Sequence, residues 1–504
     1  MTDEFPAAAA DSADGDDLPE QMKVRIDKLE RLRAAGRDPY PVSVSRTTDI
    51  AAVRTEHSAL EADSATGVSV SLTGRVIFMR TGGKLCFATL REAGEQIQAM
   101  LSLDVVGEQG LAEWKSLVDL GDQVSVTGEV ISSRRGELSI LVASWEMASK
   151  ALHPLPVEHK PLSEESRIRR RYVDLIVRPE ARAMVMTRGA VMRSLRTSME
   201  QRGYLEVETP MLHTIQGGAT ARPFRTHINA YDMELFMRIA PELFLKRCLV
   251  GGLDRVFEIN RNFRNEGADS THSPEFAMLE AYEAYGDYDT MANLTREIVQ
   301  AAAIAAFGST VVTHADGSEH DFGGEWASIG LYEAVSGAVG VEVSPQSEVE
   351  LLRALAAKAS VQLNPGWGAG KIIEELFETL VQHTLQAPTF VRDYPTENAP
   401  LTKAHRSVAG VSEKWDLYVQ GFELGTAYSE LNDPIAQREA FAAQVALATG
   451  GDAEAMAYDE DYVQALEYAM PPAGGLGMGI DRLLCAFTGR GIRETILFPF
   501  VKPM

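Results

Sequence analysis

The sequence predicts an α+β protein in which a small β-barrel precedes a larger domain built on a mixed, mainly antiparallel β-sheet flanked by helices. The chain has 504 residues, which at roughly 150 residues per domain suggests two to four domains. Residues 67–145 hold short β-rich runs in close succession. After residue 167, strand-like runs are instead dispersed among helical stretches, a pattern typical of a large α+β domain.

Charge is distributed unevenly along the chain. The formal charge is −24, of which residues 1–20 contribute −7, residues 21–150 contribute −1 and residues 151–504 contribute −16. We expect residues 1–20 to be a disordered acidic tail. An acidic surface repels nucleic acid. However, residues 21–37 carry six basic and two acidic side chains, so this one segment near the N-terminus could bind a polyanion.

Cysteine content and hydropathy argue against several classes of protein. Cys86, Cys248 and Cys485 are far apart and form no CxxC pair, which argues against a disulfide framework and a cysteine-based zinc site. The N-terminus lacks the basic and apolar runs of a secretory signal. No apolar stretch approaches the ~20 residues that span a bilayer. We therefore expect a soluble, cytoplasmic protein with no membrane partner.

The N-terminal domain is expected to span residues 21–150. Residues 21–36 alternate charged and apolar side chains, which predicts an amphipathic helix. Five β-rich runs follow between residues 67 and 145, with a helical segment, GLAEWKSLV, before the fourth run. This order is typical of an oligonucleotide-binding (OB) barrel, although it also fits another small antiparallel β-domain.

The C-terminal domain is expected to span residues 167–504, after a proline-rich linker at residues 151–166. It opens with a basic cluster at residues 167–171. A long helix is predicted over 179–202, and the next run, 203–210, is predicted to be a strand that ends at a proline.

Small insertions are expected near residues 309–385 of this domain. Residues 309–326 have the pattern of a hairpin, and residues 340–385 have the pattern of helices. No internal repeat is evident.

The chain lacks the P-loop, the GxGxxG turn after a strand, the HExxH zinc motif and the GxSxG elbow. A first informative segment, residues 254–282, places Arg264 and Glu266 on one face of a strand-like run. An arginine can clamp a phosphate through two hydrogen bonds, and Phe276 can stack on a purine. A solvated hairpin with salt-bridged side chains fits the same composition.

Two later segments carry carboxylates and glycines. Residues 416–433 hold Asp416 and Glu423, whose spacing alone does not distinguish metal ligands from exposed carboxylates. Residues 474–485, GGLGMGIDRLLC, lead into a helix with Arg482 in its first turns. Glycine permits close approach of a ligand to the backbone. Each segment alone is weak support for a site, so their combination decides the interpretation.

Together the segments resemble the class II aminoacyl-tRNA synthetases. GYLEVETP resembles motif 1 of that class, FRNEG followed by HSPEF resembles motif 2, and GLGMGIDR resembles motif 3. GGATARPFRTH, RIAPELFLKR, PTFVRDYP and YSELNDP further resemble the bacterial-type lysyl-tRNA synthetases. The resemblance runs from about residue 22 to residue 503, and it implies an OB-fold anticodon-binding domain followed by a class II catalytic domain.

The resemblance implies ATP-dependent ligation of lysine to tRNA(Lys). In that family, the lysine carboxylate attacks the α-phosphate of ATP, pyrophosphate leaves, and the terminal ribose of the tRNA then takes the aminoacyl group from lysyl-adenylate. The substrate carboxylate is itself the nucleophile, so catalysis is mostly positioning and charge stabilisation. The resemblance also implies a homodimer, with residues 203–210 and the preceding helix at the interface.

The motif matches assign ATP-binding residues. Arg264 would bind the α-phosphate and the lysine carboxylate, Phe276 would stack on adenine, and Arg482 would cover the opposite ring face and the γ-phosphate. The ATP-binding positions are Arg264, Glu266, His272, Phe276, Asp416, Glu423, Gly479 and Arg482. Asp416 and Glu423 also match the Mg²⁺-binding positions of the family. Carboxylate oxygens are ligands that Mg²⁺ prefers. Relatives often carry Glu where this chain has Asp416, which is one methylene shorter.

The same matches assign a lysine pocket. Its positions are Gly218, Glu242, Glu280, Tyr282, Thr426, Tyr428 and Glu430. Gly218 and Glu242 would hold the α-amino group, and Tyr428 would pack on the aliphatic stem. Glu280, Tyr282 and Glu430 would surround the ε-ammonium, because a buried cation needs fixed carboxylates. Thr426 stands where relatives often carry Asn, and its hydroxyl is shorter.

Arg80, Phe87, Gln98 and Glu137 match the anticodon-reading positions of the family. OB domains read single-stranded RNA by stacking bases on aromatic rings, with polar groups at the base edges. Ordinary core packing is the alternative for Phe87.

Three other functions fit part of the pattern. An aspartyl- or asparaginyl-type ligase would share the OB domain, but an aspartate pocket needs cations where this chain has Glu280 and Glu430. A paralogue that lysylates protein would lack the anticodon-binding domain. An RNA-binding protein without catalysis would not need the arginines and carboxylates of the motifs.

Overall fold

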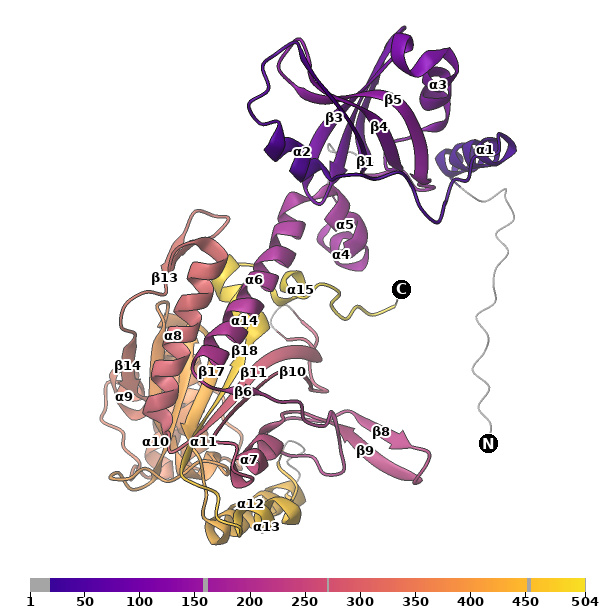
Figure 1. The fold of residues 1–504 in the computed structure, drawn as a ribbon. Helices are drawn as coiled ribbons and strands as arrows, with labels where there is room; N and C mark the ends of the chain where they lie inside the picture. The colour runs from indigo at the N-terminus through magenta and orange to yellow at the C-terminus, as the bar shows by residue number, and fades with distance from the viewer. Residues whose placement is uncertain (1–18, 157–161, 270–271, 451–454, 504) are drawn as a thin grey trace. The chain divides into compact units, whose positions relative to one another are not determined.

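A computed structural model describes residues 19–156, 162–269, 272–450 and 455–503. The chain divides into two compact units, one made of residues 1–167 and 172–179 and the other of residues 168–171 and 180–504 (Figure 1). All but the last two residues of the expected acidic tail lie outside the described residues, as do residues 157–161 of the expected linker.

The N-terminal unit is a closed five-stranded barrel with the strand order β1-β2-β3-β5-β4. Its strands are β1 (Ser64–Thr81), β2 (Leu85–Glu92), β3 (Glu95–Ser102), β4 (Gln123–Ser132) and β5 (Leu138–Ser149). Its helices are α1 (Glu20–Ala34), α2 (Ile50–Glu56) and α3 (Leu103–Leu117). The predicted amphipathic helix and the helical segment before the fourth strand are confirmed.

Strict alternation closes this barrel around an apolar core. In β2, Cys86, Ala88 and Leu90 are buried in the core, whereas the residues between them are only partly buried. Successive side chains of a strand point to opposite faces, so every second residue faces outward. Trp114 of α3 packs edge-on against Trp145 of β5, with ring centroids 5.3 Å apart.

Two short helices, α4 (Glu164–Arg169) and α5 (Arg171–Val177), lie at the boundary between the two units in sequence. The predicted long helix is confirmed as α6 (Pro179–Gln201). None of the helices in the described part of the chain is long and apolar enough to cross a membrane.

The C-terminal unit is built on an eight-stranded sheet with the order β14-β15-β16-β17-β18-β11-β10-β6. Only the β14–β15 and β10–β6 pairs are parallel, so the predicted mixed, mainly antiparallel sheet is confirmed. The strands of this sheet are β6 (Leu205–Glu206), β10 (Arg255–Phe263), β11 (Glu275–Ala284), β14 (Ala327–Gly330), β15 (Thr389–Pro395), β16 (Val411–Val419), β17 (Phe422–Ser429) and β18 (Ala473–Gly479).

Two smaller sheets accompany it. One has the order β7-β9-β8, and the other is the β12–β13 hairpin that the sequence predicts within residues 309–326. Their strands are β7 (Leu212–His213), β8 (Arg225–Ile228), β9 (Met233–Met237), β12 (Val311–Thr313) and β13 (Glu319–Asp321).

The remaining helices surround the large sheet. They are α7 (Glu242–Val250), α8 (Tyr288–Phe307), α9 (Leu331–Val339), α10 (Val349–Lys358), α11 (Ala369–Leu380), α12 (Pro434–Thr449), α13 (Glu460–Leu466), α14 (Ile480–Thr488) and α15 (Ile492–Thr495), with 3₁₀ turns at Gln382–Thr384 and Thr396–Asn398. Buried side chains of α6, α8 and α14 form one core with the sheet. The helices predicted within residues 340–385 are confirmed as α10 and α11.

The strand predicted over residues 203–210 is much shorter in the structure. Only Leu205 and Glu206 pair with a neighbouring strand, in parallel with β10. The chain then leaves the sheet before Pro210, which has no backbone N–H to donate to a ladder.

Candidate active site

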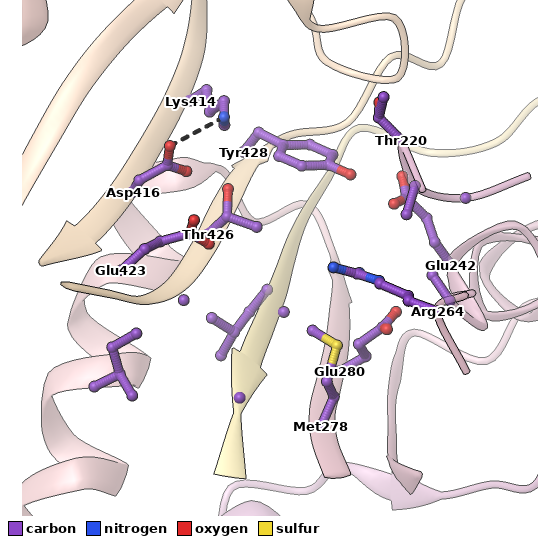
Figure 2. A pocket seen from close by; sticks show the side chains of 18 of the residues that line it. Thr220, Glu242, Arg264, Met278, Glu280, Lys414, Asp416, Glu423, Thr426 and Tyr428 are labelled. Atoms are coloured by element: carbon purple, nitrogen blue, oxygen red, sulfur yellow. Dashed lines mark hydrogen bonds and ion pairs between the residues drawn. The ribbon is translucent and has the colours of Figure 1, made fainter. Parts of the chain in front are cut away.

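A cavity of about 530 Å³ lies in the C-terminal unit (Figure 2). The predicted ATP and lysine residues line it with one exception, Glu430. They come from segments far apart in the sequence, because β10, β11, β16, β17 and β18 each end in or cross this region.

Strand alternation explains how the sheet makes both a core and a site. In β11, Leu279 and Ala281 belong to the core under the helices, whereas Glu280 and Tyr282 line the cavity. The strands β16, β17 and β18 follow the same rule: residues 415, 417, 427 and 478 face the core, and residues 416, 426, 428, 475 and 477 line the cavity. A period of two therefore places the predicted site residues of these strands on the side away from the apolar helices.

Arginines gather at one end of the cavity. The guanidinium of Arg264 lies over the Phe276 ring, with Cζ 5.0 Å from the ring centroid, and its Nε is buried with no hydrogen-bond partner among the described residues. Arg482 Nη1 donates to the Glu423 carbonyl oxygen at 2.8 Å. The cluster offers cationic groups and an aromatic face, the chemistry that binds a nucleotide.

Of the two other predicted residues at this end, Glu266 is held by a segment distant in sequence and His272 is held by its own loop. Glu266 Oε1 accepts from the Arg222 backbone N–H at 3.0 Å. The backbone N–H of His272 donates to Asp269 Oδ1 at 2.8 Å, and the His272 ring also contacts that carboxylate. Both side chains are exposed, so they border the cavity opening.

The Asp416 carboxylate faces the cavity beside Glu423 (Figure 2). Its Oδ2 accepts from Lys414 Nζ at 3.1 Å, whereas its Oδ1 is buried with no hydrogen-bond partner among the described residues. Lys414 in turn lies over the Tyr394 ring, 4.2 Å from the centroid. No group of three or more His, Cys, Asp or Glu side chains within the described ranges is arranged to hold a metal. The free Oδ1 fits an Mg²⁺ ion whose other ligands are supplied by phosphates or water.

Buried carboxylates and phenols form the other end of the cavity. Glu280 is 3% exposed, and its Oε1 has no hydrogen-bond partner within the described part of the chain. Burial, with Glu242 and Glu258 nearby, raises the pKa of Glu280 to about 8. Burial raises the pKa of Tyr282 and Tyr428 well above the usual value, so both phenols stay neutral. This end is suited to a cation that can satisfy the carboxylate.

Glu430 lies behind the cavity wall rather than in it. A Cβ on Gly475, which lines the cavity, would lie 1.8 Å from Glu430 Oε1. The absence of a side chain at Gly475 therefore provides the space that the Glu430 carboxylate occupies. Glu430 Oε2 forms an ion pair with Lys246, and Oε1 has no hydrogen-bond partner among the described residues.

The hydroxyl of Thr426 lines the cavity but is already engaged. Its Oγ1 donates to the Trp415 carbonyl oxygen at 3.3 Å. Gly218, with φ +86°, adopts a backbone conformation that a side chain would strain, and a Cβ there would lie 3.3 Å from Glu242 Cβ. These two residues limit the space around Glu242 and Tyr428.

Sequence reasoning missed several residues of the site. Lys371, Glu374 and Glu378 of α11 line the cavity. Their spacing of three and four puts them on one helix face, a signal that the sequence offered. Lys246 was also missed, although Glu242 and Lys246 stand four apart in one helix.

The predicted anticodon residues gather on the N-terminal barrel. Arg80 of β1 is directly opposite Phe87 of β2, and its guanidinium lies 5.0 Å from the ring centroid. Gln98 Nε2 donates to Ser139 Oγ at 2.8 Å, and this hydroxyl donates to the Glu137 carbonyl oxygen. Phe87 is partly buried and lies outside the barrel core, so it is not an ordinary core residue.

Two family models match the chain. The model described as tRNA synthetases class II (D, K and N) matches residues 163–502. The model described as an OB-fold nucleic acid binding domain matches residues 70–148, so the predicted OB class of the barrel is confirmed.

Curated relatives agree with these matches. The chain is 60% identical to the lysine–tRNA ligase of Mycolicibacterium gilvum over 490 residues, covering 97% of this chain and 98% of that protein. The lysine–tRNA ligase of Kineococcus radiotolerans gives the same identity and coverage. A bifunctional lysylphosphatidylglycerol biosynthesis protein of Nocardia farcinica is 50% identical over 96% of this chain and 43% of that protein. The chain therefore belongs to the lysine–tRNA ligase family of class II tRNA synthetases.

Proposed function

We propose that this protein ligates L-lysine to tRNA(Lys) at the expense of ATP, through a lysyl-adenylate whose formation releases pyrophosphate and whose reaction with tRNA releases AMP. The observation that carries the proposal is the division of one cavity into two ends. Phe276 and Arg482 line one end, the buried carboxylates of Glu242 and Glu280 line the other, and Arg264 lies beside these carboxylates where the two ends meet (Figure 2). A nucleotide and a cationic amino acid fit these two ends side by side.

In the first step, a carboxylate oxygen of lysine attacks the α-phosphorus of ATP, and the bond from that phosphorus to the bridging oxygen breaks. The electron pair of the broken bond leaves with pyrophosphate. Arg264 holds the α-phosphate and the attacking carboxylate together, and Arg482 stabilises the charge on the outer phosphates. Phe276 and Arg482 hold the adenine between them. Glu266 and His272 contact the adenine edge and the outer phosphates, and Gly479 leaves space for the nucleotide. Positioning and charge stabilisation are the main sources of rate in such a transfer.

Lysine is recognised at the opposite end. Gly218 and Glu242 hold its α-amino group, and Tyr428 packs on its aliphatic stem. Glu280, Tyr282 and Glu430 surround the ε-ammonium. The Oε1 atoms of Glu280 and Glu430, which have no hydrogen-bond partner in the part of the chain that the structure describes, support this assignment, because a buried carboxylate oxygen without a partner is costly until a donor reaches it. Thr426 shapes the pocket, since its own hydroxyl donates to the backbone.

Asp416 and Glu423 would hold Mg²⁺ together with phosphate oxygens, and the ion would neutralise charge on the outgoing pyrophosphate. Lys414 occupies Asp416 Oδ2 and leaves Oδ1 for this purpose.

The tRNA would be read by the N-terminal barrel. An anticodon base stacks on Phe87, and Arg80, Gln98 and Glu137 contact its edges. The protein would act in the cytoplasm as a homodimer. Exposed apolar side chains near β6 to β9 support the dimer, because they would be covered at an interface. They are Leu205, Met211, Leu212, Tyr231 and Met233.

Pyrophosphate exchange into ATP, measured with each of the twenty amino acids in turn, tests the proposed activity. Lysine alone is expected to stimulate exchange. Stimulation by aspartate or asparagine instead would overturn the proposal. Charging of total tRNA with lysine, set beside lysylation of protein in the same extract, distinguishes a tRNA ligase from a protein-modifying relative. Sedimentation of the purified protein tests the dimer.

A further inference from the structure

Lys246 is a fully buried cation that lies behind the lysine end of the cavity. It belongs to α7 and is 0% exposed. It does not itself line the cavity. Its Nζ donates to Glu242 Oε1 at 2.6 Å and to the Leu401 carbonyl oxygen at 3.4 Å, and it forms an ion pair with Glu430 Oε2. One ammonium thus joins two carboxylates that come from separate segments, α7 and the end of β17.

Burying these charges is costly unless they compensate one another. Without Lys246, Glu242 and Glu430 would stand with Glu280 as three buried carboxylates and no ammonium between them. Like charges in a low-dielectric site drive one another to bind protons. Burial raises the pKa of Glu430, and the ion pair with Lys246 opposes that rise. The same carboxylates raise the pKa of Lys246, so the ammonium stays charged.

The charges near the pocket match those of free lysine. When lysine is bound and the three carboxyls are ionised, Glu242, Glu280 and Glu430 carry three negative charges, and Lys246 and Arg264 carry two positive charges. The sum is one negative charge. Lysine at neutral pH carries two ammonium groups and one carboxylate, hence one net positive charge. The occupied pocket is then neutral, whereas loss of Lys246 would leave it with an excess negative charge or a proton on a carboxylate.

We propose that Lys246 is a positioning residue for lysine recognition, which holds the carboxylates of Glu242 and Glu430 in place through its hydrogen bond and its ion pair so that their remaining oxygens can receive the substrate's ammonium groups. The proposal rests on the proposed function, since it takes free lysine as the ligand. It gives Lys246 no contact with substrate. Its effect passes through the two carboxylates.

The titratable groups that face Lys246 and its two carboxylates, or belong to them, come from each element packed around this lysine. They are Glu242 from α7, Glu280 and Tyr282 from β11, Tyr428 from β17, Glu430 after β17, and Tyr462 from α13. The three phenols have pKa values raised by burial and stay neutral. The carboxylates are therefore the groups that take up a proton when Lys246 is removed.

The full-length protein offers a matched pair of variants. Lys246→Met is compared with Lys150→Met, which removes a buried lysine of the N-terminal unit that is also held by two carboxylates and a carbonyl oxygen. Lysine binding without ATP is measured by calorimetry from pH 6 to pH 9, and the lysine and ATP KM values are measured by pyrophosphate exchange. Lys246→Met is expected to weaken lysine binding at pH 7 by about tenfold or more, because a rise of one pKa unit in Glu430 costs that factor.

The pH profile separates positioning from a structural role. In Lys246→Met the loss of lysine affinity relative to the wild type should shrink toward pH 9, where Glu430 ionises without its partner. The ATP KM should change by less than about twofold. Lys246→Arg should restore part of the affinity, and Lys150→Met should leave lysine binding unchanged. If Lys246→Met does not fold, Lys246→Met/Glu430→Gln removes the pair together, and it should fold with its pH dependence of lysine binding reduced relative to the wild type.

Two results would overturn the inference. One is lysine affinity in Lys246→Met equal to that of the wild type at pH 7. The other is a loss of lysine affinity in Lys246→Met that is equal at every pH and is accompanied by the same fold loss of apparent affinity for ATP. Absence of lysine binding in the wild-type protein would instead overturn the proposed function, so the two failures are distinguishable.

Discussion

Two buried lysines, one in each unit, are held by similar groups, but their carboxylate partners differ in how fully they are satisfied. In the N-terminal unit, Lys150 Nζ contacts Asp119, Asp122 and the Leu117 carbonyl oxygen at 2.6–2.8 Å. Asp119 Oδ1 accepts from Lys28, and Asp122 also accepts from the Asp119 and Ala151 backbone N–H groups. Every carboxylate oxygen of this cluster has a donor.

The cluster around Lys246 in the C-terminal unit is incomplete. Glu430 Oε1 and the neighbouring Glu280 Oε1 have no hydrogen-bond partner among the described residues. Because native proteins satisfy nearly all buried polar groups, each exception calls for an explanation such as a ligand. The same ion-pair chemistry therefore completes a structural cluster where every carboxylate oxygen has a donor, and it leaves a binding site where some oxygens have none.

Arg264→Ala is expected to give the largest functional effect, because it removes the clamp on the α-phosphate. Pyrophosphate exchange should fall about 10³-fold or more, the range seen when a preorganised charge is removed from a transition state. Its counterpart in the N-terminal unit is Arg25, whose guanidinium donates to the Ala151 and Leu120 carbonyl oxygens at 2.9 Å. Arg25→Ala should lower the free energy of unfolding by about 1–3 kcal/mol and leave exchange intact. Wild-type exchange in Arg264→Ala would contradict the assignment.

Glu430→Gln is expected to raise the lysine KM about 30-fold while changing the ATP KM by much less, because the ε-ammonium loses a charged acceptor worth ~2 kcal/mol. The matched change is Asp122→Asn, which removes a carboxylate from the satisfied cluster and should reduce stability only. Steady-state exchange at varied lysine and ATP separates the two KM values. Equal effects on both substrates would count against the pocket.

Much of the fold could be predicted because it depends on patterns among neighbouring residues. The five barrel strands, the α6 helix and the antiparallel sheet follow from alternation and helical periodicity, which act over neighbouring residues. The strand at 203–210 was wrong in length, since pairing in this structure depends on β10, about fifty residues later. No local pattern reports where a distant strand ends.

The site was predictable to the extent that its residues carry motifs. Composition alone left Arg264 and Glu266 as an ordinary hairpin, and the resemblance supplied their expected roles. The sequence did not predict a role for Lys246, because that role depends on its burial and on its ion pair with Glu430, which is 184 positions away in the sequence. The position of Glu430 behind Gly475 also depends on strand register, which pairs Tyr428 with Gly475. Contacts of this kind arise only when the sheet assembles.

Lysine binding is expected to release a proton in the C-terminal unit and to depend on pH. The pKa of Glu280 is about 8, so this carboxyl is mostly protonated at pH 7 before lysine binds. A bound ε-ammonium favours the ionised form and lowers that pKa. Affinity therefore rises with pH, by about tenfold from pH 6 to pH 7, and levels off above pH 8. Groups facing Glu280 are Glu242, Glu258, Arg238, Arg264, Tyr282, Tyr428 and Glu430.

Calorimetry at pH 7 in buffers of different ionisation enthalpy measures the released proton. Glu280→Gln should abolish most of the release and flatten the affinity between pH 6 and pH 8. Asp122→Asn, in the satisfied cluster, should leave both unchanged even though burial raises the pKa of Asp122 as well. Release of a full proton by Glu280→Gln would show that another group titrates.

Phe87→Ala should give the smallest effect and should separate the two units by function. The barrel presents an aromatic ring, Phe87, opposite Arg80. Loss of one stacked base costs ~1 kcal/mol at the low end, so the KM for tRNA in charging should rise about fivefold while pyrophosphate exchange is unchanged. Phe87→Tyr keeps the ring and should charge tRNA normally. If exchange falls with charging, and the unfolding temperature falls too, then Phe87 supports the fold of the barrel rather than the binding of RNA.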